Sequence, residues 1–330
     1  MIISKTPLRI SFLGGGTDIP SYYNLNEYGC VISSSIANYI YVIVKKQSEI
    51  FSEKFRLNYS ETEIISDINK IKNPIIKECL KFLQIDEKLY IATIADIPAS
   101  TGLGSSSSFC VGLLNALYKL KGQDVSSHRL TEEASHVEIN LLKKPIGKQD
   151  QYAAAFGGLN LIKFHLNETV DINPVKINSS NFLKFQKSMM IFWSGVQRSS
   201  DTILSEQKIN STNNNKNLTK LRSLTLSLKT YLEVGQIKME SIGDLLNQGW
   251  ELKKTFASKI TNLNINNAYA EAIKNGAYGG KLLGAGGGGF LMLIAESDKH
   301  IQIENVLKKF GFIKFQFDID SLGSTVTNLY

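Results

Sequence analysis

Glycine and serine residues are concentrated in one segment whose composition suits the binding of phosphate. Residues 98–109 read Pro-Ala-Ser-Thr-Gly-Leu-Gly-Ser-Ser-Ser-Ser-Phe. Glycine lets backbone N–H groups approach a ligand closely, and the free N–H groups at the start of a helix favour a negative charge. A flexible linker is the alternative, but linkers separate domains, whereas this segment lies between a strand pattern and an apolar helical pattern. We therefore predict a phosphate-binding turn.

Two further glycine groups lie at the ends of strand patterns. Residues 14–18 read Gly-Gly-Gly-Thr-Asp, and residues 284–289 read Gly-Ala-Gly-Gly-Gly-Gly. The P-loop pattern is absent, because Lys281 follows Gly280 but is itself followed by Leu282. Residues 284–289 match the dinucleotide pattern GxGxxG, but a strand pattern follows them where that fold has a helix. The sequence therefore predicts neither a P-loop nucleotidase nor a dinucleotide-binding fold.

The elements that must position these loops follow from residue type and spacing. Strands are predicted over residues 8–13, 39–44, 89–97, 159–164 and 189–193. Helices are predicted over 105–121, about 128–142 with Ser126 or Ser127 as N-cap, from near Gly147, within 218–260 with a break near Gly235, and over 264–276. The end of the chain has a strand–helix–strand order over 290–294, 298–310 and 312–317, which suits a split βαβ sheet. We predict an α+β protein with two domains, residues 1–185 and 186–330.

Composition limits the class of protein. The 330 residues carry a net charge of +7, are 43% hydrophobic and contain no apolar run long enough to cross a membrane. The lysines are spread along the chain and are not clustered with aromatic residues, which favours an anionic small molecule over a nucleic acid. The start of the chain lacks an export signal and the three cysteines are scattered. We therefore expect a cytoplasmic protein without disulfides or a zinc site.

Three segments resemble the motifs of the GHMP kinase superfamily, which includes galactokinase, homoserine kinase, mevalonate kinase and phosphomevalonate kinase. Residues 98–107 resemble its P-x-x-x-G-L-G-S-S-[AS] motif. Residues 6–12 and 284–290 match its other two motifs in the same order. The resemblance implies a two-domain fold, with an N-terminal domain like one from a ribosomal protein and a C-terminal ferredoxin-like domain with extra helices.

A narrower resemblance is to the D-glycero-D-manno-heptose 7-phosphate kinases of this superfamily. It rests on residues 9–18 and on residues 145–158, which read Pro-Ile-Gly-Lys-Gln-Asp-Gln-Tyr-Ala-Ala-Ala-Phe-Gly-Gly. It implies transfer of phosphate from ATP, with Mg²⁺, to the anomeric C1 hydroxyl of a heptose 7-phosphate, for nucleotide-activated heptose synthesis. L-fucose kinase shares a similar first segment, so another sugar kinase is the alternative. A non-catalytic binding protein with the same fold is a further one.

By this resemblance, the turn and the start of the following helix bind ATP. The residues implied are Pro98, Ser100, Thr101, Gly102, Leu103, Gly104, Ser105, Ser106 and Ser107. Ser106 and Glu138 match the residues that bind Mg²⁺, although Glu138 taken alone is typical of a solvated helix residue. The chain departs from the family pattern at Ser107 and at residues 141–144, which replace a more acidic, glycine-bearing connection. We expect these departures to leave the implied roles unchanged.

The resemblance also assigns the chemistry. Asp150 matches the catalytic aspartate, which accepts the proton of the attacking hydroxyl or positions that hydroxyl. Arg9 matches a neighbouring basic residue that could keep Asp150 ionised or stabilise the transferring phosphoryl group. An acid placed favourably at a helix N-terminus is the structural alternative for Asp150. The residues implied in binding a sugar and its phosphate are Arg9, Gly15, Gly16, Thr17, Asp18, Lys148, Asp150, Arg198, Lys281, Gly286 and Gly287.

Overall fold

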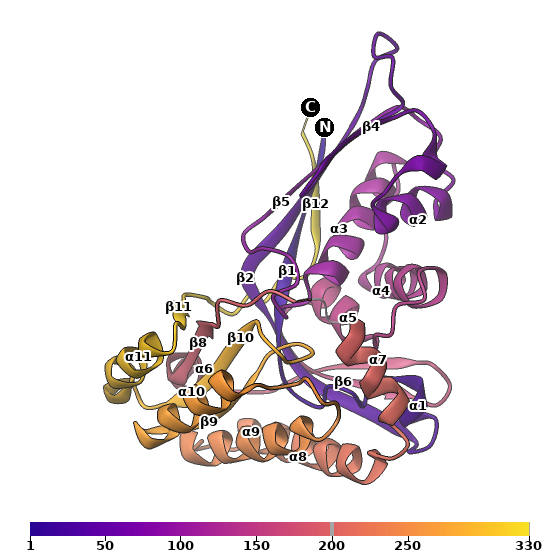
Figure 1. Ribbon diagram of the computed structural model, residues 1–330. Helices are drawn as coiled ribbons and strands as arrows, with labels where there is room; N and C mark the ends of the chain where they lie inside the picture. The colour runs from indigo at the N-terminus through magenta and orange to yellow at the C-terminus, as the bar shows by residue number, and fades with distance from the viewer. Residues whose placement is uncertain (199–200, 330) are drawn as a thin grey trace.

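The computed structural model describes residues 1–198 and 201–329, and within them the strands form two sheets (Figure 1). The first sheet has the order β12-β1-β2-β5-β3-β4, and beside this path β6 pairs with both β2 and β7. The second sheet has the order β11-β8-β10-β9. The strands are β1 (Ile2–Leu13), β2 (Tyr28–Lys46), β3 (Phe55–Asn58), β4 (Thr62–Ile65), β5 (Leu89–Ala95), β6 (Leu159–His165), β7 (Val170–Pro174), β8 (Met189–Trp193), β9 (Ala277–Leu282), β10 (Phe290–Ala295), β11 (Ile313–Phe315) and β12 (Thr325–Asn328).

Helices pack on both sheets and also connect them. The helix α3 (Ser105–Leu120) packs against β1 and β2. The helix α9 (Met239–Lys254) packs on β9 and β10, while α8 (Asn215–Glu233) packs on α9 and reaches β1 and β2. The remaining helices are α1 (Pro20–Tyr23), α2 (Pro74–Phe82), α4 (Ser127–Ser135), α5 (Gln149–Phe156), α6 (Ser179–Ser188), α7 (Asp201–Asn210), α10 (Leu263–Lys274) and α11 (His300–Lys309), with short helical turns at Ile68–Lys70, His136–Leu141 and Ser297–Lys299.

The strand β1 carries a charged residue into the interior. Every residue of β1 from Thr6 to Leu13 is buried, and Arg9 lies in the middle of this run. The register between β1 and β2 shifts after Pro7, which has no N–H group to donate to the strand ladder. A charge is buried in a strand only when it is paired, so Arg9 is expected to have a specific partner.

The second sheet has the split βαβ arrangement that the sequence predicted. Both β10 and β11 are antiparallel to β8, which lies between them. They are therefore parallel to each other, and α11 connects them along the chain. The strand order is that of a ferredoxin-like sheet, and more helices lie between β8 and β9 than the single one that this arrangement needs.

Two predicted helices differ in the structure. The helix expected over about 128–142 divides into α4, capped by the Ser126 side chain, and a π-helical turn at His136–Leu141. Such turns widen the helix by one residue and occur frequently at functional sites. The pattern over 218–260 forms α8 and α9, and α9 ends at Lys254, six residues before the predicted end.

A domain boundary near residue 185 stays a proposal. The last strand of the chain lies in the first sheet, so the second domain does not extend to residue 330. The predicted boundary falls inside α6, which leads directly into β8 of the second sheet. After β11 the chain returns to the first sheet, where β12 pairs with the start of β1 (Figure 1). The two termini consequently lie side by side. We propose that residues 186–315 form the second domain and that the final strand belongs to the first.

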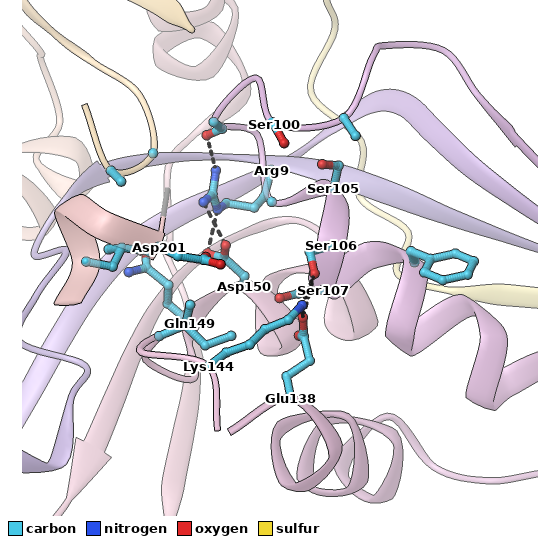
Figure 2. Close-up of a pocket in the computed structure, with 18 of the residues that line it drawn as sticks. Arg9, Ser100, Ser105, Ser106, Ser107, Glu138, Lys144, Gln149, Asp150 and Asp201 are labelled. Atoms are coloured by element: carbon cyan, nitrogen blue, oxygen red, sulfur yellow. Dashed lines mark hydrogen bonds and ion pairs between the residues drawn. The ribbon is translucent and has the colours of Figure 1, made fainter. Parts of the chain in front are cut away.

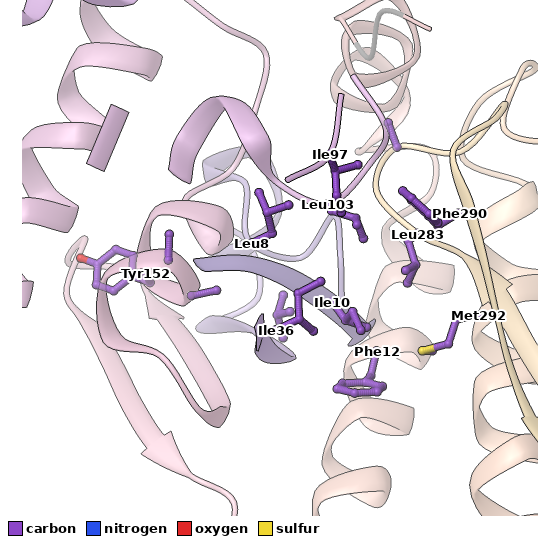
Figure 3. Packing of buried hydrophobic residues seen from close by; sticks show 14 of the residues in the cluster. Leu8, Ile10, Phe12, Ile36, Ile97, Leu103, Tyr152, Leu283, Phe290 and Met292 are labelled. Carbon is purple, nitrogen blue, oxygen red and sulfur yellow. The ribbon is translucent and has the colours of Figure 1, made fainter. Parts of the chain in front are cut away.

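Apolar residues from both sheets form one core (Figure 3). Leu8, Ile10 and Phe12 of β1 are buried in the same cluster as Phe290 and Met292 of β10. This continuous packing fixes the loops at the strand ends relative to one another. No helix among residues 1–198 and 201–329 is long and apolar enough to cross a membrane.

Candidate active site

The predicted phosphate-binding turn lies between β5 and α3. Gly104 takes the left-handed backbone conformation (φ 78°) at the N-cap of α3. A side chain at this position would be strained and would lie 3.1 Å from the Arg9 side chain. The serines at 105–107 form the first turn of α3, where free N–H groups and the helix dipole favour an anion. The strand-to-helix turn is confirmed, and phosphate binding stays a prediction.

A cavity of about 720 Å³ lies beside this turn and brings together most of the predicted site residues. Its wall is formed by the first glycine loop, by residues 98–107, by the segment that leads into α5, and by residues from α7, α9 and the end of β9. The predicted residues that line it are Arg9, Gly15, Gly16, Asp18, Pro98, Ser100, Gly102, Gly104, Ser105, Ser106, Ser107, Glu138, Asp150, Arg198 and Lys281.

The other predicted residues do not line this cavity. The Thr17 hydroxyl is buried and donates to the carbonyls of Gly14 and Cys30, at 2.8 and 2.9 Å. Lys148 forms an ion pair with Glu168. The remaining members of this group are Thr101 and Leu103, which are buried, and Gly286 and Gly287, which lie close to the backbone of residues 259–260. Ligand binding by these residues stays a prediction.

Arg9 and Asp150 form a two-point ion pair at the centre of the cavity (Figure 2). Arg9 Nε donates to Asp150 Oδ1 at 2.7 Å, and Nη2 donates to Oδ2 at 2.8 Å. The third nitrogen, Nη1, donates to the carbonyl of Gly102 at 2.8 Å and so ties the phosphate turn to the pair. Arg9 is 5% exposed and the Asp150 side chain is 24% exposed. The carboxylate is therefore held in a fixed orientation while one side stays open to the cavity.

Ser106 and Glu138 meet at the start of α3, and Lys144 joins them (Figure 2). Ser106 Oγ donates to Glu138 Oε1 at 2.7 Å, and Lys144 Nζ donates to the same two oxygens at 2.6 and 2.9 Å. Glu138 is fully buried and lies on the π-helical turn, and its other oxygen accepts a hydrogen bond from Gln151. Residues 141–144 nevertheless reach the site, because Lys144 contacts both predicted metal ligands, and the roles of these ligands stay predictions.

Asp18 anchors a polar cluster on the first glycine loop. Its Oδ1 accepts a hydrogen bond from the Gly16 amide and its Oδ2 accepts one from the Gln149 side chain, both at 2.9 Å. Burial raises the pKa of Asp18, although the Gly16 hydrogen bond opposes this shift. A side chain on Gly147 would lie 2.0 Å from Asp18 Oδ2, so only glycine fits there. A carboxyl group in this setting is well placed to bind sugar hydroxyls.

Two buried lysines line the cavity near Arg9. Lys281 Nζ donates to the carbonyl of Ser11 at 2.8 Å, and Lys253 Nζ donates to the carbonyls of Leu282 and Gly284. Burial, with Arg9 nearby, lowers the pKa of Lys281 to about 7. Burial and the neighbouring cations lower the pKa of Lys253 well below its usual range. Such a pair gains free energy when an anion enters the cavity.

The sequence reasoning missed Lys144, Gln149 and Lys253. Lys253 had a signal, because it continues the buried stripe that Leu246 and Trp250 form on α9. A lysine on an apolar helical face needs an anion or carbonyl partner. Lys144 and Gln149 lie in segments that the resemblance singled out, residues 141–144 and 145–158, but charged and polar residues are ordinary in a loop or at a helix start.

The donors at the start of α3 suit a hard divalent cation. A serine hydroxyl and a buried carboxylate are oxygen ligands of the kind that Mg²⁺ prefers, and they lie beside the predicted phosphate site. The residues present therefore fit the metal that the resemblance implies.

Comparison with known proteins supports the resemblance to the GHMP kinases over most of the chain. Residues 69–158 match the model of the GHMP kinases N terminal domain, and residues 232–312 match that of the GHMP kinases C terminal domain. A D-glycero-alpha-D-manno-heptose 7-phosphate kinase of Campylobacter jejuni is 28% identical over 322 residues, covering 93% of each chain. A galactokinase of Pyrococcus furiosus is 25% identical and covers 96% of this chain and 95% of its own.

Solved structures show the same fold. A D-glycero-D-manno-heptose 1-phosphate kinase from Bacteroides thetaiotaomicron matches with a TM-score of 0.81 and 24% identity over the whole of both chains. A galactokinase of Lactococcus lactis, solved with galactose, matches with a TM-score of 0.76 and 18% identity over 99% of this chain and 95% of its own. With its glycine- and serine-rich turn before α3, its Arg9–Asp150 pair and matches to both family domains, the chain belongs to the GHMP kinases and is an ATP-dependent sugar kinase.

Proposed function

We propose that this enzyme phosphorylates the anomeric C1 hydroxyl of D-glycero-D-manno-heptose 7-phosphate to give the 1,7-bisphosphate, for nucleotide-activated heptose synthesis. The observation that supports a sugar phosphate as the substrate is that the buried lysines Lys253 and Lys281 line the same cavity as Asp18 and Asp150. The carboxyl groups suit a polyol, and the lysines suit an anion attached to it. The Campylobacter jejuni relative bears the name of the same activity.

The ATP end of the cavity is the turn before α3. Its amides and the serines at 105–107 would bind the phosphates, with the helix dipole supplying the positive field. Ser106 and Glu138 would hold Mg²⁺, which when bound neutralises charge on the phosphates. No P-loop lysine is needed for this arrangement, because cations and helix amides provide the charge.

The sugar end is formed by Asp18, Asp150 and Arg9. Asp150 is oriented by Arg9 to accept the C1 hydroxyl proton as the sugar oxygen forms its bond to the γ-phosphorus and the bond to ADP breaks. The Arg9 guanidinium then faces the negative charge that develops on the transferred group. Asp18, fixed by Gly16 and Gln149, holds other hydroxyls of the sugar so that the C1 oxygen points at the phosphate.

The non-reacting phosphate of the substrate would bind at the lysine pair. Lys281 and Lys253 are held by main-chain carbonyls, and Arg198 lines the same cavity. A sugar without this phosphate would bring no anion to these two lysines, whose pKa values burial lowers, so it would lack the ion pairing that favours the sugar phosphate. This difference is the physical basis for selecting a sugar phosphate over a free sugar.

A panel of sugars tests the proposal. ADP release is measured with D-glycero-D-manno-heptose 7-phosphate, L-fucose and galactose at equal concentrations. We expect the heptose phosphate to give the highest kcat/KM, by about 10²-fold or more, because the lysine pair is paired only in that complex. Turnover of fucose or galactose without turnover of the heptose phosphate would contradict the substrate and leave the kinase intact.

The affinity for the sugar phosphate is expected to fall as the pH rises from 7 to 9. The pKa of Lys281 is lowered to about 7, so its ammonium group loses its proton over this range, whereas a bound anion favours the protonated form. The phosphate itself stays doubly charged, because its second pKa is about 6. The dissociation constant, measured by calorimetry without ATP, should rise by up to about tenfold per pH unit.

The Lys281→Arg variant is the matched control for this pH effect. A guanidinium keeps its charge to above about pH 12, so the rise in the dissociation constant should be smaller in this variant. Arg9, Arg198 and Lys253 line the same cavity and are unchanged in this variant. An identical pH profile in the variant and the parent enzyme would remove Lys281 from the phosphate site.

A further inference from the structure

Lys144 occupies the position between the two predicted metal ligands. Its Nζ lies 2.6 Å from Ser106 Oγ and 2.9 Å from Glu138 Oε1, and these oxygens are themselves 2.7 Å apart. The three polar atoms therefore form a closed triangle at the first turn of α3 (Figure 2). Gln151 satisfies the other oxygen of Glu138. The Lys144 ammonium thus supplies the positive charge that this buried carboxylate needs.

An ammonium group and a divalent cation cannot share these oxygens. Both bind to the same lone pairs, and two cations at such short separation repel each other strongly in a partly buried site. Glu138 is fully buried, so removing its counter-ion without a replacement is costly. The site must therefore contain one cation or the other, so that Glu138 keeps a positively charged partner before and after the exchange.

The backbone around Lys144 is fixed while its side chain has room to move. The Lys144 amide donates to the carbonyl of Glu138 at 3.0 Å, and Pro145 follows. The side chain is 22% exposed and lines the same cavity as the serines at 105–107. A four-carbon stem can carry the ammonium from the carboxylate to a phosphate bound beside these serines.

We propose that Lys144 is a built-in counter-ion that holds Ser106 and Glu138 ready before ATP binds. It releases these oxygens when Mg²⁺ arrives with ATP and then pairs with the ATP phosphates. The consequence is that nucleotide-free enzyme binds divalent cations weakly, so the metal enters with the nucleotide. The proposal depends on the ATP and Mg²⁺ chemistry of the proposed function and is independent of the identity of the sugar.

Metal binding to the nucleotide-free, full-length Lys144→Met variant tests the proposal. Mn²⁺ is the probe, and free Mn²⁺ is counted by electron paramagnetic resonance during titration. We expect the variant to bind Mn²⁺ at least about tenfold more tightly than the parent enzyme, because the competing charge is gone. Mg²⁺ should also raise the Tm of the variant more than that of the parent. Equal Mn²⁺ affinities would overturn the proposal.

Matched variants separate this role from a general loss of charge. Lys143 is the adjacent, exposed lysine, and Lys143→Met should leave both Mn²⁺ affinity and the Tm response unchanged. The gain in affinity should disappear in the Lys144→Met, Glu138→Gln double variant, because its carboxylate is absent. Lys144→Gln keeps a hydrogen-bond donor without the charge, and it replaces Lys144→Met in the Mn²⁺ titration if that variant fails to fold. A gain in Mn²⁺ affinity that survives Glu138→Gln would place the metal elsewhere and contradict the proposal.

Discussion

Replacement of Asp150 by Asn is expected to lower kcat by about 10³-fold while leaving nucleotide affinity nearly unchanged. Asparagine has the same shape and can still accept a hydrogen bond from Arg9 Nε, so the geometry of the pair is largely kept. It has no negative charge and cannot take the proton of the sugar hydroxyl. The loss therefore falls on the chemical step and not on ATP binding at the turn before α3.

Steady-state kinetics and nucleotide titration together check this result. The exposed acid Asp86 gives the matched control. Asp86→Asn removes the same charge from a side chain that is 94% exposed to solvent, so it should leave kcat unchanged. Circular dichroism and the Tm show whether the Asp150→Asn variant is folded. A folded variant with the turnover of the parent enzyme would exclude a role for Asp150 in proton transfer or in positioning the hydroxyl.

Replacement of Arg9 by Met is expected to reduce both activity and stability. Arg9 joins three parts of the site, because it bonds both Asp150 oxygens and the carbonyl of Gly102 from within β1. Methionine fills a similar volume but leaves the Asp150 carboxylate without its partner. The free energy of unfolding should fall by about 3 kcal/mol, and kcat by about 10²-fold or more, since charge on the transferred group also loses its partner.

Urea unfolding and kinetics measure these two losses separately. The matched control is Arg129→Met, which breaks the surface pair with Glu133, where the arginine is 53% exposed. That change should cost much less stability than Arg9→Met, because a surface ion pair is screened by solvent, and it should leave kcat unchanged. Equal losses of stability in the two variants would show that Arg9 contributes no more than a surface ion pair.

Elements with strong local patterns were predictable. The strand expected over 189–193 is β8 with the same bounds, and the helix expected over 105–121 is α3, one residue shorter. Both are runs of buried residues whose spacing alone identifies the element. β12 was not predictable, because its four residues carry little pattern and it is held by pairing with β1, more than 300 residues away in the chain.

In the candidate site, too, some residues could be identified from the sequence and others only from the structure. Motif residues such as Asp18, Glu138 and Asp150 were identified because the glycine loops and the Gln-Asp segment have a recognisable order along the chain. Lys144 was given no role, because residues 141–144 depart from the family pattern and match none of its functional residues. Its role depends on a distance of 2.9 Å to Glu138, which exists because the π-helical turn and the following loop bring the two together.

The sequence by itself determined the family motifs, the phosphate turn and the main strands and helices, since each of these depends on residues that are close together in the chain. Only the tertiary structure decided which charges meet. Arg9 reaches Asp150 across 141 positions, and Lys281 reaches the carbonyl of Ser11 across 270. Burial in one shared cavity then lowers the pKa of the lysines and raises that of Asp18, because desolvation depends on everything packed around a group and not on its neighbours in sequence.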